Sequence, residues 1–156
     1  MKKIILVIAL LFPIGVIVFL RFFGKNEFTI PVYYESGVND IPASCNRNYQ
    51  SPYQVSDTLL KNFGWSGTAT LIVTDTTVQT ALTRLDQEFS AEVQTIYLSG
   101  EKDDLDQFFT CDLLLQKPWT TVLLDDQRRI RGYYDPKTRE EVDRLIVELK
   151  ILLNKY

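Results

Sequence analysis

The stretch that decides the fold is residues 123–135, LLDDQRRIRGYYD. It reads as two short strands joined by a charged turn at residues 125–129, which is the pattern of a β-hairpin. The charges of this turn are most simply a self-neutralising tip exposed to solvent. Arginine is favoured at protein interfaces, so a partner-docking surface is the alternative for Arg128, Arg129 and Arg131.

The hairpin is followed by the clearest helical pattern in the chain. Apolar residues recur at helical spacing from Val142 to Leu153, which predicts an amphipathic helix with one buried face. Thr138 and Glu141 have the spacing of a capping box at its start. A start one turn earlier, at residues 135–136, is the alternative.

Upstream of the hairpin, the pattern predicts a strand, a helix and a second strand. Residues 69–75, ATLIVTD, and residues 93–100, VQTIYLSG, are short apolar runs typical of strands. Between them, residues 78–89 carry apolar side chains at helical spacing, with Asp75 or Thr76 as the N-cap.

The order of these elements predicts the fold class. Residues 102–109 add a short acidic helix, so the order is strand, helix, strand, helix, hairpin, helix. A crossover makes the first two strands parallel, and the hairpin adds an antiparallel edge. We therefore expect an α/β, thioredoxin-like fold with a central mixed sheet over residues 66–156. Residues 24–65, which are rich in Pro, Gly, Asn and Ser, are predicted to be a loop-rich extension with at most a short edge strand.

The N-terminal segment predicts a membrane anchor. Residues 4–20 hold no charged side chain, and with the phenylalanines beyond Arg21 the run approaches the ~20 residues that cross a bilayer. Residues 1–23 are therefore expected to form one transmembrane helix, with a cleaved signal peptide as the alternative. Lys2 and Lys3 favour a cytoplasmic N-terminus, which would place the C-terminal domain on the extracytoplasmic, periplasmic side.

Charge and cysteine content narrow the function classes. Residues 1–23 hold three of the 17 basic residues and none of the 20 acidic ones, so the remainder is acidic and disfavours a nucleic-acid partner. Cys45 and Cys111 are the only cysteines and are expected to form one disulfide in an oxidising compartment. Two unrelated thiols, or a two-thiol site for Cu(I) or redox chemistry, are the alternatives.

A cluster of acidic residues extends through the second predicted helix and beyond both of its ends. It consists of Glu101, Asp103, Asp104, Asp106 and Asp112. The spacing matches no EF-hand loop, so a solvated helix face is preferred over a cation site.

Residues 119–153 resemble the C-terminal part of the Sco/SenC family. The resemblance lies in the strand VLLD, the turn through Gln127, the sequence RIRGYYD and the helix EEVDRLIVELKILL. The family consists of thioredoxin-fold proteins tethered to membranes that serve copper delivery to cytochrome c oxidase. The resemblance therefore implies the same fold and a membrane or respiratory-complex setting.

The resemblance also implies a copper site, which these residues do not reproduce. The family holds copper with a Cys-x-x-x-Cys motif at the start of the first helix and a distant histidine, ligands that suit copper. Here residues 74–80 read TDTTVQT, residues 117–119 read KPW, and the chain has no histidine. We therefore predict no catalytic, cofactor-binding or metal-binding residues, and no enzymatic activity.

Three functions remain open at this point. The first is a membrane-anchored, non-catalytic Sco/SenC-like protein with an accessory or binding role, in which respiratory-complex or assembly proteins are the partners. The second is a residual thiol redox or Cu(I)-binding protein that uses Cys45 and Cys111. The third is a generic extracytoplasmic protein-interaction domain.

Overall fold

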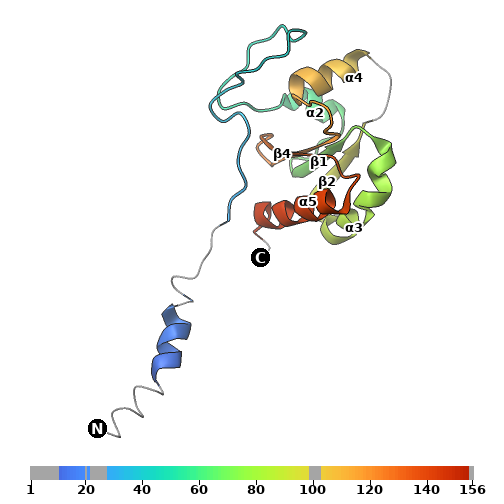
Figure 1. Ribbon diagram of the computed structural model, residues 1–156. Helices are drawn as coiled ribbons and strands as arrows, with labels where there is room; N and C mark the ends of the chain where they lie inside the picture. The colour runs from blue at the N-terminus through green and yellow to red at the C-terminus, as the bar shows by residue number, and fades with distance from the viewer. Residues whose placement is uncertain (1–10, 20, 22–27, 99–102, 155–156) are drawn as a thin grey trace, which may run out of the picture.

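A four-stranded mixed sheet forms the centre of the molecule (Figure 1). The computed structural model describes residues 11–19, 21, 28–98 and 103–154. The strands are β1 (Ala69–Val73), β2 (Val93–Tyr97), β3 (Thr121–Leu124) and β4 (Ile130–Tyr134), in the order β2-β1-β3-β4. β1 and β2 are parallel, whereas β3 is antiparallel to β1 and to β4. The predicted α/β class and the hairpin are confirmed.

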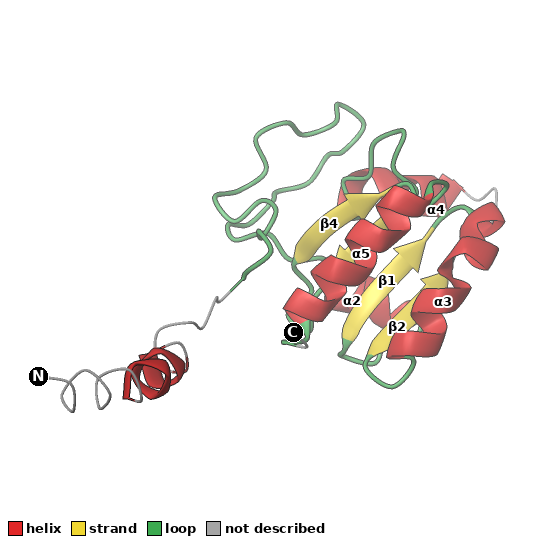
Figure 2. Cartoon of the chain, turned by 60° about the horizontal axis from the view of Figure 1, so that its bottom comes forward, coloured by secondary structure: helices red, strands yellow, loops and turns green. Residues whose placement is uncertain are grey.

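Helices cover both faces of this sheet. α3 (Gln79–Phe89) and α5 (Arg139–Leu152) lie on one face, where Figure 2 shows them in front of the strands. α2 (Asp57–Asn62) and the segment formed by α4 (Asp103–Gln107) and a π-helical turn (Phe108–Asp112) cover the other face. The result is three layers with two apolar cores, one on each side of the sheet.

Alternation along the strands explains the two cores. Leu71 and Val73 of β1 pack with α3 and α5, whereas Ile72 packs with α2 and the π-helical turn. All five residues of β1 are buried, as expected for a central strand covered on both faces.

A β-bulge in β4 sets which side chains reach which core. Leu123 pairs with Gly132 while Leu124 pairs with Ile130, so Arg131 is the extra residue. Without it, strict alternation would place Ile130 on the same face as Gly132. The bulge instead puts Ile130 in the α2 core together with Tyr133.

Both long helices begin at residues suited to capping. Thr138 accepts a hydrogen bond from the Glu141 backbone N–H, as the predicted capping box requires. Asp75 caps a 3-10 turn, Thr76–Val78, that leads directly into α3. The predicted helices that correspond to α3 and α5 are therefore confirmed. Of the two candidate caps before α3, Asp75 is the one that caps.

The N-terminal extension contributes to the fold more than a loop would. α2 was not predicted, and together with Tyr53 and Val55 it supplies part of the core beneath the sheet. Upstream, the Tyr33 backbone N–H bonds the Ile130 carbonyl at 2.9 Å, so the chain follows β4 without forming a regular strand.

The structure does not bear out the predicted membrane anchor. Residues 11–19 and 21 are helical, whereas the rest of the predicted span, residues 4–10 and 20, lies outside the described residues. Across the part of the chain that is described, no helix combines the length and apolar character needed to cross a bilayer. The predicted single-pass anchor and the periplasmic placement derived from it are therefore wrong. The described helical residues of this segment, 11–19 and 21, are fewer than the about 20 that a bilayer-spanning helix needs.

Candidate functional site

Two segments that the resemblance associates with copper meet at one cavity. Thr74, at the end of β1, lines a cavity of about 440 Å³ with Lys117, Pro118 and Trp119. The Lys117–Pro118 peptide bond is cis. Gln116, Asp135 and Lys137 also border this cavity, so its polar lining combines hydroxyl, amide, carboxylate and ammonium groups.

Asp135 lines this cavity, with Oδ1 3.7 Å from Lys137 Nζ, whereas the neighbouring Asp75 is occupied by capping. Asp75 Oδ1 accepts from the Thr77 backbone N–H at 2.9 Å and from the Thr77 hydroxyl at 2.6 Å, and Oδ2 lies 3.5 Å from Lys137 Nζ. The Thr77 hydrogen bonds, followed by Lys137, lower the pKa of Asp75 below its ordinary value. Asp75 is therefore ionised at neutral pH and acts as a helix cap.

The two cysteines lie elsewhere and are joined. Cys45 and Cys111 form a disulfide with a Cα–Cα distance of 5.5 Å, and both residues are buried. The bridge links the N-terminal extension to the π-helical turn, across 66 residues of sequence. The cavity beside Thr74 and Lys117 and the two cysteines are thus formed by different parts of the fold.

Polar contacts surround the disulfide and fasten the same two segments. Arg47 forms an ion pair with the buried Asp112. The Tyr49 hydroxyl donates to the Cys111 carbonyl at 2.9 Å, and the Tyr53 hydroxyl donates to the Asp112 carbonyl at 2.6 Å. We call this set of four interactions between residues 45–53 and residues 111–112, disulfide included, the clasp.

The clasp satisfies groups that a helix end leaves without partners. The last carbonyls of a helix accept no hydrogen bond from within the helix. Burying such a carbonyl without another donor costs free energy. Tyr133 completes the pattern by donating to the Leu113 carbonyl at 2.8 Å. Burial is the largest cause that raises the pKa of Tyr53 and of Tyr133, so both remain protonated donors.

Asp112 is the most unusual charge in this region. Its side chain is 3% exposed, and burial raises its pKa more than the facing Arg47 guanidinium lowers it. A buried carboxylate of this kind is expensive unless it is paired, which explains why Arg47 is held against it.

The three arginines of the predicted docking surface have partners within the chain. Arg129 Nε bonds Asp125 Oδ2 at 2.7 Å, and Arg131 bonds the same oxygen at 3.3 Å. Arg131 also bonds the Ile30 carbonyl at 2.6 Å. Arg128 donates to the Gln54 side chain at 3.2 Å. Arg128 and Arg131 therefore hold the extension to the hairpin, whereas Arg129 pairs within the hairpin turn.

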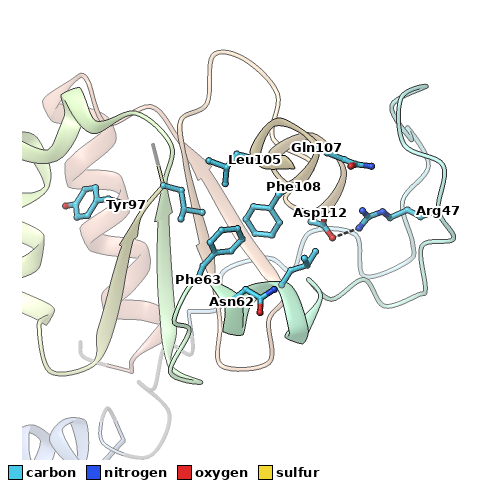
Figure 3. Close-up of a pocket in the computed structure, with 10 residues that line it drawn as sticks. Arg47, Asn62, Phe63, Tyr97, Leu105, Gln107, Phe108 and Asp112 are labelled. Atoms are coloured by element: carbon cyan, nitrogen blue, oxygen red, sulfur yellow. Dashed lines mark hydrogen bonds and ion pairs between the residues drawn. The ribbon is translucent and has the colours of Figure 1, made fainter. Parts of the chain in front are cut away.

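Another cavity, with a volume of about 580 Å³, lies between α2 and α4 (Figure 3). We call it the α2–α4 pocket. Its apolar lining comes from Leu59, Phe63, Leu98, Leu105 and Phe108. Its polar groups are Arg47, Asn62, Gln107 and Asp112, of which Arg47 and Asp112 belong to the clasp.

The aromatic floor of the pocket is well defined. The Phe63 and Phe108 rings pack with centroids 4.8 Å apart, and Phe108 is buried. Tyr97 borders the pocket, but its side chain points away, as Figure 3 shows, and its hydroxyl donates to Asp86 on α3 at 3.2 Å. Burial, then Asp86, raises the pKa of Tyr97 to about 12.

Sequence reasoning did not find this pocket, because its residues come from four separate segments. One available signal was the position of its charged pair: Arg47 and Asp112 flank the two cysteines in sequence. A bridge between Cys45 and Cys111 necessarily brings these two side chains near one another.

Comparisons with known proteins add no assignment. Across residues 11–19, 21, 28–98 and 103–154, no group of three or more His, Cys, Asp or Glu side chains is placed to hold a metal ion. No protein-family model, curated protein or solved structure matches the chain.

Proposed function

We propose that this chain is a non-catalytic binding protein on a thioredoxin-like scaffold similar to the Sco/SenC family. It acts as an accessory component in respiratory oxidase assembly and receives its ligand or partner group in the α2–α4 pocket. The observation that carries the binding role is this pocket, because it joins an apolar lining to an ion pair whose carboxylate, that of Asp112, is buried.

The thioredoxin-like assignment is supported by element order and by the meeting of two segments. A parallel pair of strands is followed by an antiparallel hairpin and a closing helix. The end of β1 and the segment before β3, which the resemblance brings together, border one cavity through Thr74 and Lys117.

A binding role fits the chemistry of the residues better than thiol exchange does. Exchange requires a thiolate that can attack, and thiolate reactivity needs exposure and a lowered pKa. Cys45 and Cys111 are bonded to one another in the core, and Asp75 is committed to capping. The α2–α4 pocket needs no such activation.

A pocket-filling substitution tests the proposal. Leu59→Trp adds volume to the pocket wall, whereas Thr58→Trp places the same side chain at an exposed position on the same helix. In cells that lack the chain, we expect respiratory oxidase activity to fall. The wild type and Thr58→Trp should restore it, and Leu59→Trp should not.

Two outcomes would contradict the proposal. Oxidase activity that does not change when the chain is removed would overturn the respiratory role. Full restoration by Leu59→Trp, combined with loss of function in a folded Cys45→Ala/Cys111→Ala variant, would favour the thiol alternative. Titration of the reduced protein with Cu(I) then distinguishes metal binding from redox exchange.

A further inference from the structure

We infer that the α2–α4 pocket selects an apolar group that carries a cationic N–H donor, such as a protonated amine, at one end. This inference rests on the proposed function, because it names the chemical class of the ligand for the same pocket. It follows from three properties of the pocket: its apolar lining, its buried carboxylate and the charges around it.

The apolar part of the ligand is set by the walls. Leucine and phenylalanine side chains surround the cavity; they come from α2, α4, the π-helical turn and the residues that directly follow α2 and β2. The cavity volume of about 580 Å³ is in the range of small-molecule sites, roughly 300–1,000 Å³. Burying an aromatic or aliphatic body there removes apolar surface from water, at about 25 cal/mol per Å².

The polar end of the ligand is set by Asp112. Asp112 lines the pocket, its side chain is 3% exposed, and Arg47 engages its Oδ1. An ionised carboxylate has about four lone-pair sites, so Asp112 can accept a further hydrogen bond from a ligand. A charged donor makes the stronger bond with a carboxylate, particularly in a partly desolvated site.

The surrounding charges favour a cation over an anion. On α4, Asp106 is exposed and lies between Leu105 and Gln107, which line the pocket. Among the described bases near the pocket, Arg47 is paired with Asp112 and Lys61 with Asp57 at 2.7 Å. Asp106 and Asp112 would therefore repel a ligand carboxylate and attract an amine.

Three probes with one apolar body test the inference. We would titrate the full chain with 4-phenylbutylamine, 4-phenylbutan-1-ol and 4-phenylbutyrate, using calorimetry and NMR. The amine should bind about tenfold more tightly than the alcohol, and the carboxylate should bind most weakly. Leu59→Trp should abolish binding of the amine, and Thr58→Trp should leave it unchanged.

A charge variant separates recognition by Asp112 from a structural role. Asp112→Asn keeps an acceptor for Arg47 but removes the charge, so the amine should lose its tenfold advantage while alcohol binding is retained. Asp143→Asn, which removes an acidic group on α5, is the matched control and should preserve the advantage. Retained alcohol binding shows that the pocket of the variant is intact.

The outcomes distinguish this inference from the proposed function. Equal binding of the three probes, tightest binding of the carboxylate, or no binding of any probe overturns the ligand class. If Leu59→Trp still fails to restore oxidase activity in cells, the proposed binding function stands even though the ligand class is wrong. If Leu59→Trp restores that activity, the proposed function fails whatever the probes show.

Discussion

The ring of Tyr134 lies directly over Gly132 in β4, so that a β-carbon at Gly132 would be 2.6 Å from Tyr134 Cζ. The ring is held in place from the other side. Its hydroxyl donates to Glu148 at 2.5 Å, and the Arg144 guanidinium lies 4.7 Å from the ring centroid. Position 132 is therefore restricted to glycine by its neighbour two residues along the strand.

Gly132→Ala is expected to destabilise the protein by about 1–3 kcal/mol, the usual cost of overpacking a core. The added methyl must displace a buried ring that is anchored by Glu148 and Arg144. Urea unfolding measures this loss. Adding Tyr134→Leu removes the ring, so the two substitutions should be less than additive. Strict additivity would show that the ring is not the cause.

Removal of the disulfide by Cys45→Ala/Cys111→Ala should lower the free energy of unfolding by about 4 kcal/mol. The reason is that the bridge closes a loop across a sequence separation of 66 residues in the unfolded chain. Urea unfolding of oxidised wild type, reduced wild type and the double variant measures the effect. Reduced wild type should match the variant, and a loss below about 1 kcal/mol would contradict the entropic account.

Arg131→Met should loosen the attachment of the extension to the hairpin. The substitution removes the bond to the Ile30 carbonyl and one of the bonds to Asp125, at a cost of about 2–3 kcal/mol. Hydrogen exchange should show faster exchange of the Tyr33 amide, which bonds the Ile130 carbonyl. Arg139→Met, at a side chain that is 84% exposed, is the control and should cost no more than about 0.5 kcal/mol. Unchanged protection of Tyr33 would contradict this role.

Asp112 should make the protein less stable as pH rises. Burial raises its pKa in the folded state, so the folded state holds the proton more tightly than the unfolded state does. Stability is therefore lost as pH rises from the ordinary aspartate value through the raised one. Unfolding of wild type and Asp112→Asn at several pH values isolates this contribution, because the other carboxylates, and the facing Arg47, Tyr49 and Tyr53, are common to both proteins.

The contribution of Asp75 to stability should change with pH in the opposite direction to that of Asp112. Its pKa is lowered by Thr77 and Lys137, so its contribution to stability is present above the ordinary aspartate value and lost on acidification. Relative to Asp75→Asn, wild type should gain stability as pH rises. Equal slopes for the two comparisons would contradict both assignments.

The elements predicted from sequence are those with a strong local pattern. α5 has a full apolar stripe and a capping box, and the hairpin has two β-rich runs around a polar turn, so local residues alone specify them. α3 was predicted for the same reason, with buried Leu82 and Leu85 on the face that its spacing indicated.

The elements that were missed depend on distant contacts. α2 has six residues, too few for an amphipathic pattern to emerge, and it is stabilised by burying Leu60 under the sheet. The clasp joins the π-helical turn to residues 45–53. The spacing of apolar residues along the sequence does not indicate contacts between segments so far apart. The α2–α4 pocket requires both of these elements, which is why the sequence alone did not reveal it.

The N-terminal extension and the sheet share one apolar core, so the protein cannot be divided between them. Tyr53, Val55 and Leu60 cover Ile72 and Val122 on the underside of the sheet. A polypeptide cut at residue 66 would retain every strand of the sheet, yet it would leave that underside open to water. Such a fragment would be prone to self-association, because exposed apolar patches promote it. The smallest autonomous unit therefore begins upstream of α2, and the order of the strands does not mark where the domain starts.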